Sequence, residues 1–233
     1  MSEGQHPKNS PSEGIAPERT SGRGTRVSRG EPAGGSPVSE GQSRSGVLFD
    51  MDGTLVEVPY DWTRIRADLG AFEISILTYL GRLEEPERSR KWAILERHEA
   101  AATRQARLRP GVRRLLKRLK KRGVRTALVT NNSRKNTDIL LGRFGLGFDL
   151  VLTRDDGLWK PSGDPLVAAM GRLGLGPSEC LAVGDSHFDV RAAREAGIPR
   201  IYVIGAPDAA FAGEDVVVVP SIAAFERASG LFG

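Results

Sequence analysis

Short apolar runs alternate with helical patterns along most of the chain, and this alternation limits the possible folds more than any other feature. Six runs have the length and composition of buried strands: 47–49, 125–129, 149–152, 181–183, 201–204 and 216–219. Four segments between them place apolar residues at helical spacing: 112–122, 137–144, 165–173 and 189–196. The alternation predicts an α/β fold of three layers, in which a Rossmann-like parallel sheet carries helices on both faces.

Residues 58–108 interrupt this alternation, because they contain no candidate strand. The segment is interpreted as two helices, over about 62–83 and 86–108. An insertion at this position would lie over the carboxyl ends of the strands, where parallel sheets bind ligands. We therefore predict a small helical cap over 58–108, inserted into a core of residues 46–57 and 109–233. An ordinary crossover that has lengthened is the alternative.

The first 45 residues have a different composition, since roughly half of them are Gly, Ser or Pro and none is aromatic. Such a segment cannot bury enough apolar surface to offset its backbone entropy, so we expect a disordered tail over 1–45. It holds no apolar run typical of a signal peptide, and its five glutamates argue against an organellar transit peptide.

Charge and composition exclude several classes of partner. No stretch approaches the roughly 18–20 apolar residues of a membrane span, so no membrane is expected. The net charge is +5, but the basic residues crowd into predicted helices between Arg82 and Arg122, which indicates a solvated face. No nucleic-acid-binding motif accompanies them, so no nucleic acid is expected. Cys180 is the only cysteine, which fits a reducing cytoplasm.

Polar groups follow three of the predicted strands. Asp50 and Asp52 come directly after the first strand, and two carboxylates this close repel, which implies a cation or separate roles. An acidic turn is the plain alternative. Thr130 ends the second strand, where a hydroxyl and backbone N–H groups can hold a phosphoryl oxygen, although Thr is also a common helix cap. Asp185 and Asp189 follow the fourth strand, and carboxylates suit a hard ion such as Mg²⁺.

Together with Lys160-Pro161, these segments resemble the haloacid dehalogenase (HAD) superfamily in their order: DMDGTL, then Thr130, then Lys-Pro, then GDSHFD. The stretch VGDSHFDVRAAREAGIPRIYV is similar to the phosphoglycolate phosphatase-like branch, subfamily IA. The resemblance covers about 46–219. It implies a HAD-like core with a cap, and a Mg²⁺-dependent phosphohydrolase that acts on a small phosphorylated metabolite.

The resemblance implies a role for each matched residue. Asp50 would be the nucleophile, and Asp52 would protonate the leaving group and later activate water. Thr130 would bind a phosphoryl oxygen with the backbone N–H of Asn131, and Lys160 would offset negative charge there.

The resemblance also implies how Mg²⁺ would be held. Asp50 and Asp185 would bind it through their side chains, and Asp52 through its backbone carbonyl. Asp189 would support the metal site or Lys160 without binding the metal itself.

Alternatives stay open within the same frame. Asp52 argues against dehalogenase and phosphonatase chemistry, but a phosphomutase would keep it. A non-catalytic binding protein is disfavoured, because the four charged motif residues Asp50, Asp52, Lys160 and Asp185 are all present. Gly163 stands where relatives often have Pro, and the cap is shorter than in many of them. A monomer and a homodimer both remain possible.

Overall fold

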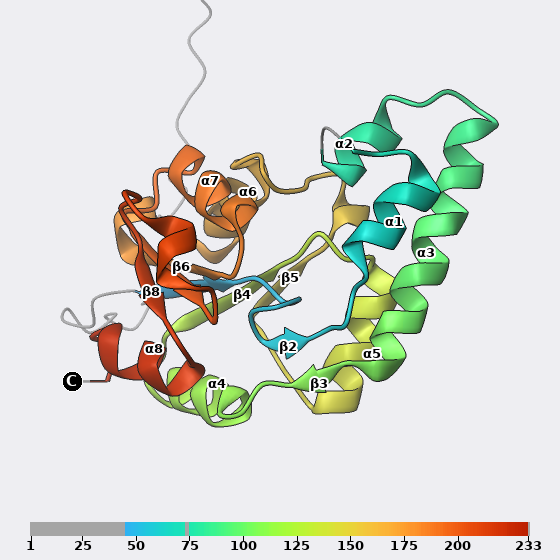
Figure 1. Ribbon diagram of the computed structural model, residues 1–233. Helices are drawn as coiled ribbons and strands as arrows, with labels where there is room; N and C mark the ends of the chain where they lie inside the picture. Colours follow the sequence, from blue (N-terminus) through green and yellow to red (C-terminus); the bar gives the residue numbers. More distant parts are fainter. Residues whose placement is uncertain (1–44, 73–74, 233) are drawn as a thin grey trace, which may run out of the picture. The chain divides into compact units, whose positions relative to one another are not determined.

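The computed structural model describes residues 45–72 and 75–232 (Figure 1). The tail that the sequence predicts over 1–45 therefore lies outside the described residues, apart from its last residue. Within the described ranges, no helix is both long enough and apolar enough to cross a membrane.

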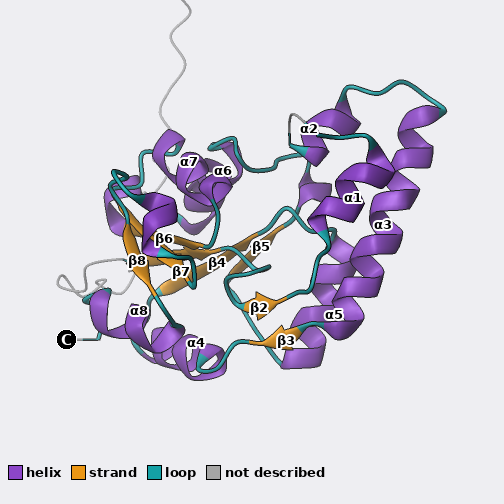
Figure 2. Ribbon diagram, viewed as in Figure 1, coloured by secondary structure: helices purple, strands orange, loops and turns teal. Residues whose placement is uncertain are grey.

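A six-stranded sheet forms the core, and every neighbouring pair in it is parallel. Its spatial order is β5 (Leu150–Leu152), β4 (Arg125–Val129), β1 (Gly46–Phe49), β6 (Cys180–Gly184), β7 (Arg200–Ile204) and β8 (Val217–Val219). Figure 2 shows the strands of this sheet in orange and labels β4, β5, β6, β7 and β8. All six predicted strands are confirmed, and β1 lies between β4 and β6, the strands that Thr130 and Asp185 directly follow.

Helices cover both faces of the sheet, so the three-layer α/β prediction is confirmed. Along β1, Val47 and Phe49 point into one apolar cluster and Leu48 into the other, as alternation in a strand requires. The first cluster includes residues of α4 (Val112–Lys121), α5 (Arg134–Phe144) and α8 (Ile222–Ala228). The second includes residues of α6 (Asp164–Leu173) and α7 (His187–Glu195). Three short 3₁₀ helices complete the core: η1 (Arg154–Asp156), η2 (Pro177–Glu179) and η3 (Asp208–Phe211).

The described residues of the segment between β1 and α4 form three helices and a pair of short antiparallel strands. The helices are α1 (Trp62–Leu69), α2 (Ile76–Gly81) and α3 (Glu87–Gln105), and they pack around their own apolar cluster. The strands β2 (Val56–Glu57) and β3 (Arg107–Leu108) pair antiparallel at the two ends of the segment. Figure 1 shows α1, α2 and α3 apart from the main sheet. The limits 58–108 of a separate cap domain stay a prediction.

Two details of that segment differ from the sequence prediction. A single helix over 62–83 is wrong, because Gly70 ends α1 with a left-handed backbone, φ 70°, and Ser75 caps the start of α2. The apolar spacing continues across this break, so periodicity alone could not reveal it. The second helix ends at Gln105, and the strand β3 follows where no strand was predicted.

Phe225 offers a test of how the core is packed. It lies on α8, is fully buried, and meets the rings of Phe49 and Tyr202 edge-on at 6.2 and 5.1 Å. We expect Phe225→Ala to lower the free energy of unfolding by about 3–5 kcal/mol in urea titrations. Ile139→Ala, on the exposed side of α5, should change it by less than about 0.5 kcal/mol. Equal effects would contradict this packing.

Candidate active site

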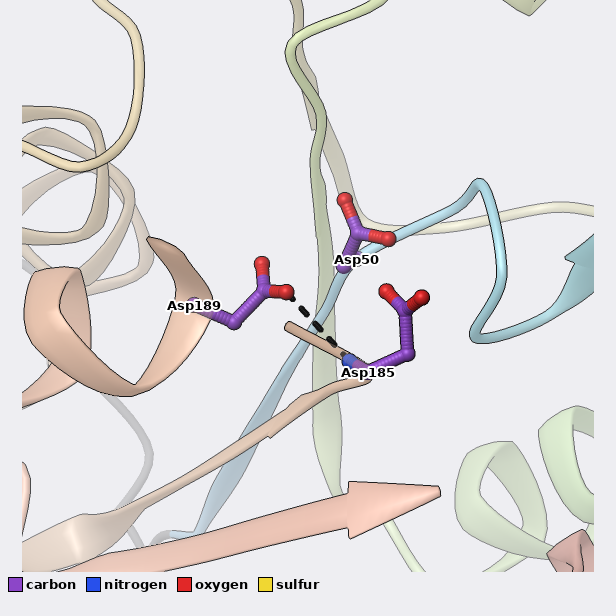
Figure 3. Close-up of side chains that lie close together, drawn as sticks. All are labelled: Asp50, Asp185 and Asp189. Atoms are coloured by element: carbon purple, nitrogen blue, oxygen red, sulfur yellow. Dashed lines mark hydrogen bonds between the residues drawn. The ribbon is translucent and has the colours of Figure 1, made fainter. Parts of the chain in front are cut away.

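The parallel register brings Asp50, Thr130 and Asp185 to one edge of the sheet. Phe49 is paired with Leu128 of β4 and with Val183 of β6, so the residues that follow these strands emerge together. Asp50 continues this register by donating its backbone N–H to the carbonyl of Val183 at 2.8 Å. Figure 3 shows the side chains of Asp50, Asp185 and Asp189 gathered at this edge.

Lys160 lies between two of these carboxylates. Its Nζ is 2.5 Å from Oδ1 of Asp50 and 2.6 Å from Oδ1 of Asp189, and the lysine is almost fully buried. The side chain of Asn131 fixes the lysine backbone, since it donates to the carbonyl of Lys160 and accepts from its N–H, both at 2.8 Å. Sequence reasoning assigned Asn131 only a backbone N–H, and missed this use of its amide.

Two glycines allow the acidic loops to approach this closely. A Cβ at Gly53, whose φ is 86°, would overlap the carboxylate of Asp185. A Cβ at Gly184 would overlap the side chain of Asp189. Both positions therefore require glycine for the acids to lie where they do.

The three carboxylates form a group that fits a divalent metal ion. One side-chain oxygen from each of Asp50, Asp185 and Asp189 lies within 4.8 Å of the others. Lys160 supplies a single positive charge to them, and carboxylate oxygens are the ligands that hard divalent cations prefer. Asp189 already accepts from Lys160 through Oδ1 and from Ser186 Oγ through Oδ2, so Asp50 and Asp185 keep more capacity for a cation.

The pKa values of these acids reflect burial and crowding. Burial, and then the charge of Asp50, raise the pKa of Asp185 to about 8. Burial also raises the pKa of Asp50 to about 6, although the ammonium of Lys160 opposes it. For Asp189 burial works in the same direction, but Lys160 and the Ser186 hydrogen bond outweigh it and lower the pKa. A bound cation would offset the repulsion that the group contains.

Asp52 has different surroundings. Its Oδ2 accepts a hydrogen bond of 2.8 Å from Nδ2 of Asn132, whereas its buried Oδ1 has no partner among the described residues. Burial, followed by the nearby charge of Asp50, raises the pKa of Asp52 to about 7. Thr130 is buried beside this region, and its hydroxyl accepts from the backbone N–H of Asn132 at 3.1 Å.

A cavity of about 410 Å³ opens over these groups. It is lined by the edge of the sheet and by the inserted segment, residues 58–108, which holds α1, α2 and α3. All of the predicted site residues line it: Asp50, Asp52, Thr130, Asn131, Lys160, Asp185 and Asp189. The inserted segment adds a lining that is largely apolar, with Trp62, Leu77 and Leu95 among its members. Tyr60, Glu99 and Asn132 also line it, and sequence reasoning did not assign them.

Glu99 forms a buried ion pair with Arg154. Its two oxygens lie 2.5 and 2.8 Å from the guanidinium nitrogens, and each residue is 5% exposed. The guanidinium also lies over the ring of Trp92 and donates to the carbonyl of Asn131 at 3.4 Å. The pair joins α3 to η1 across 55 positions, so no local pattern could have revealed it.

Comparison with known proteins identifies the family. The model of the haloacid dehalogenase-like hydrolase family matches residues 45–197, and the chain belongs to this family of hydrolases. The hydrolase YOR131C of Saccharomyces cerevisiae is 31% identical over 65% of this chain and 73% of its own length. A phosphoglycolate phosphatase of Pectobacterium atrosepticum is 33% identical over 65% of this chain and 76% of its own length.

A solved structure agrees with these relatives. CbbY of Rhodobacter sphaeroides, solved in complex with phosphate, is 26% identical and superposes with a TM-score of 0.58. The superposition covers 78% of this chain and 96% of that one. The resemblance and the HAD-like fold predicted from the sequence are therefore confirmed.

The Glu99–Arg154 pair leads to a stability prediction. Arg154→Leu leaves a buried carboxylate without its partner, and we expect it to lower the free energy of unfolding by about 3–5 kcal/mol. The double variant Glu99→Leu with Arg154→Leu removes both charges and should lose less than about 1 kcal/mol. Urea titrations followed by tryptophan fluorescence measure both. A double variant no more stable than Arg154→Leu would contradict the expectation.

Proposed function

We propose that this hydrolase is a Mg²⁺-dependent phosphatase of small phosphomonoesters that works through a phosphoaspartate on Asp50. One observation carries the proposal: two aspartates two positions apart lie in one cavity with different partners. Asp50 contacts the ammonium of Lys160 and lies beside Asp185. Among the described residues, the carboxylate of Asp52 has one hydrogen-bond donor, the neutral amide of Asn132. A relative named phosphoglycolate phosphatase and a phosphate-bound relative support the same chemistry.

In the first step, a carboxylate oxygen of Asp50 attacks phosphorus while the bond from phosphorus to the ester oxygen breaks. Asp52 gives its proton to the departing oxygen, so an alcohol leaves and the phosphoryl group stays on Asp50. Lys160 and the hydroxyl of Thr130 line the cavity where the phosphoryl oxygens would bind, and they stabilise the charge that these oxygens carry.

In the second step, water attacks the phosphoaspartate, and the ionised Asp52 takes the proton of that water. The bond from phosphorus to Asp50 breaks, inorganic phosphate leaves, and both aspartates return to their starting states. Mg²⁺ would be held by the side chains of Asp50 and Asp185, as the chemistry of these donors supports, and by the carbonyl of Asp52. When bound, it offsets the negative charge of the phosphoryl group.

The proposal also covers the substrate, the partners, the oligomeric state and the cellular compartment. The substrate is a small phosphorylated metabolite, without nucleic acid or membrane as partner. The chain acts as a monomer or homodimer in the cytoplasm, and its single buried cysteine favours this reducing compartment.

The nucleophile is tested with Asp50→Asn, which keeps the shape of the side chain and removes its charge. We expect Mg²⁺-dependent release of inorganic phosphate from 4-nitrophenyl phosphate by the unchanged chain, and a loss of about a thousandfold or more in the variant. Asp138→Asn makes the same change on the exposed side of α5 and should keep full activity. Equal turnover by the Asp50 variant and the unchanged chain would contradict the role of Asp50.

The metal site is tested with Asp185→Asn. We expect the variant to bind Mg²⁺ about 10–100-fold more weakly, as measured by calorimetry. Without Mg²⁺ and at pH 9, the variant should unfold at a higher temperature than the unchanged chain, because Asp185, whose pKa is raised to about 8, is then one of several crowded buried charges. Asp138→Asn is again the control for both measurements. Unchanged Mg²⁺ affinity in Asp185→Asn would place the metal elsewhere.

A further inference from the structure

Asn132 connects the proposed acid to a tyrosine of the inserted segment. Its Nδ2 donates to Oδ2 of Asp52 at 2.8 Å and to the hydroxyl of Tyr60 at 3.0 Å. The asparagine is 3% exposed, so water competes little for these hydrogen bonds. It directly follows the loop residues Thr130 and Asn131, but neither the family resemblance nor the sequence motifs give it a role.

The orientation of this amide is fixed by its other end. Oδ1 of Asn132 accepts from the backbone N–H of Ser133 at 2.8 Å and from Nδ2 of Asn136 at 3.2 Å. Rotation of the amide by half a turn would remove the acceptor of both donors and would set its oxygen against a carboxylate oxygen of Asp52. The N–H groups of Asn132 therefore face Asp52 and Tyr60.

We propose that Asn132 is a positioning residue for Asp52, an inference that rests on the proposed function. Oδ2 of Asp52 is occupied as an acceptor by Asn132. Oδ1 is buried and has no partner among the described residues, so it is the oxygen left to serve the substrate. The proton that the leaving group receives is thus carried on Oδ1, and it moves to the ester oxygen as the bond to phosphorus breaks.

Tyr60 completes the arrangement from the inserted segment. It lies between β2 and α1, and its ring packs against Trp62 with centroids 4.6 Å apart. Its hydroxyl accepts the second N–H of Asn132, which would otherwise be buried without a partner. Tyr60→Phe removes this acceptor but leaves the bond from Asn132 to Asp52, so its effect should be the smaller one.

The test compares two esters that differ in their need for an acid. 4-Nitrophenolate leaves readily without a proton, whereas the alkoxide of benzyl phosphate requires one. kcat/KM covers the steps up to the first departure of the alcohol, so the later role of Asp52 toward water does not enter. For Asn132→Leu in the full chain with Mg²⁺, we expect kcat/KM for benzyl phosphate to fall about 100-fold and that for 4-nitrophenyl phosphate less than about threefold.

Two controls separate positioning from a general structural defect. Thr137→Val removes a buried hydroxyl on α5, the helix that begins just after Asn132. This hydroxyl donates to the carbonyl of Ser133 and touches neither Asp52 nor Tyr60 by hydrogen bonds. The substitution should leave the ratio of the two kcat/KM values unchanged. In an Asp52→Ala background, Asn132→Leu should no longer change that ratio, because the group through which it acts is absent.

The outcomes separate this inference from the proposed function. Selective loss on benzyl phosphate that disappears in the Asp52→Ala background supports the positioning role. Equal losses on both esters, or a selective loss that persists without Asp52, would overturn it while leaving the phosphatase proposal intact. An unchanged chain that releases no phosphate from either ester would overturn the proposed function and this inference together.

Discussion

The active-site edge depends on the ammonium group of Lys160, which lies between the carboxylates of Asp50 and Asp189. Burial of these acids without a positive partner would be strongly unfavourable, and each lies close enough to the other for repulsion to add to that cost. Lys160 comes from a loop far along the chain, and the amide of Asn131 holds its backbone at both hydrogen-bonding groups. The loop after β4 thus fixes the position of the lysine, and the lysine in turn favours the ionised form of Asp50.

Asp50 and Asp52 have different proposed roles because their hydrogen-bond partners differ in charge. Burial of the two carboxyl groups raises both pKa values, that of Asp50 to about 6 and that of Asp52 to about 7. The ammonium of Lys160 lies beside Asp50, and its full positive charge favours the ionised carboxylate. Asp52 is paired with Asn132, which offers only the dipole of an amide. The nucleophile is therefore the more readily ionised, and Asp52 more readily keeps a proton to donate. Two identical side chains acquire different roles from their surroundings.

The sequence predicted what depends on local pattern. Apolar runs fixed the six strands, and the rule that parallel strands end at one edge placed Asp50, Thr130 and Asp185 together. The prediction of a single helix over 62–83 failed at Gly70, because apolar spacing continues across the break between α1 and α2. Sequence reasoning also missed Glu99–Arg154 and Tyr60–Asn132, since each pair joins residues more than 50 positions apart. Asn131 was a predicted site residue and Asn132 directly follows it, but nothing in the sequence shows where an amide points.

The two asparagines explain how the inserted segment meets the chemistry of the core. Arg154, held by Glu99 of α3, donates to the carbonyl of Asn131, and Tyr60 accepts from the side chain of Asn132. Asn131 in turn holds Lys160, and Asn132 holds Asp52. The segment that lines the cavity with apolar groups therefore reaches Asn131, which holds Lys160, through Arg154, and contacts Asn132, which holds Asp52, directly through Tyr60. Because both connections pass through adjacent positions of one loop, a change in how the helices lie over the cavity would reach Lys160 and Asp52 together.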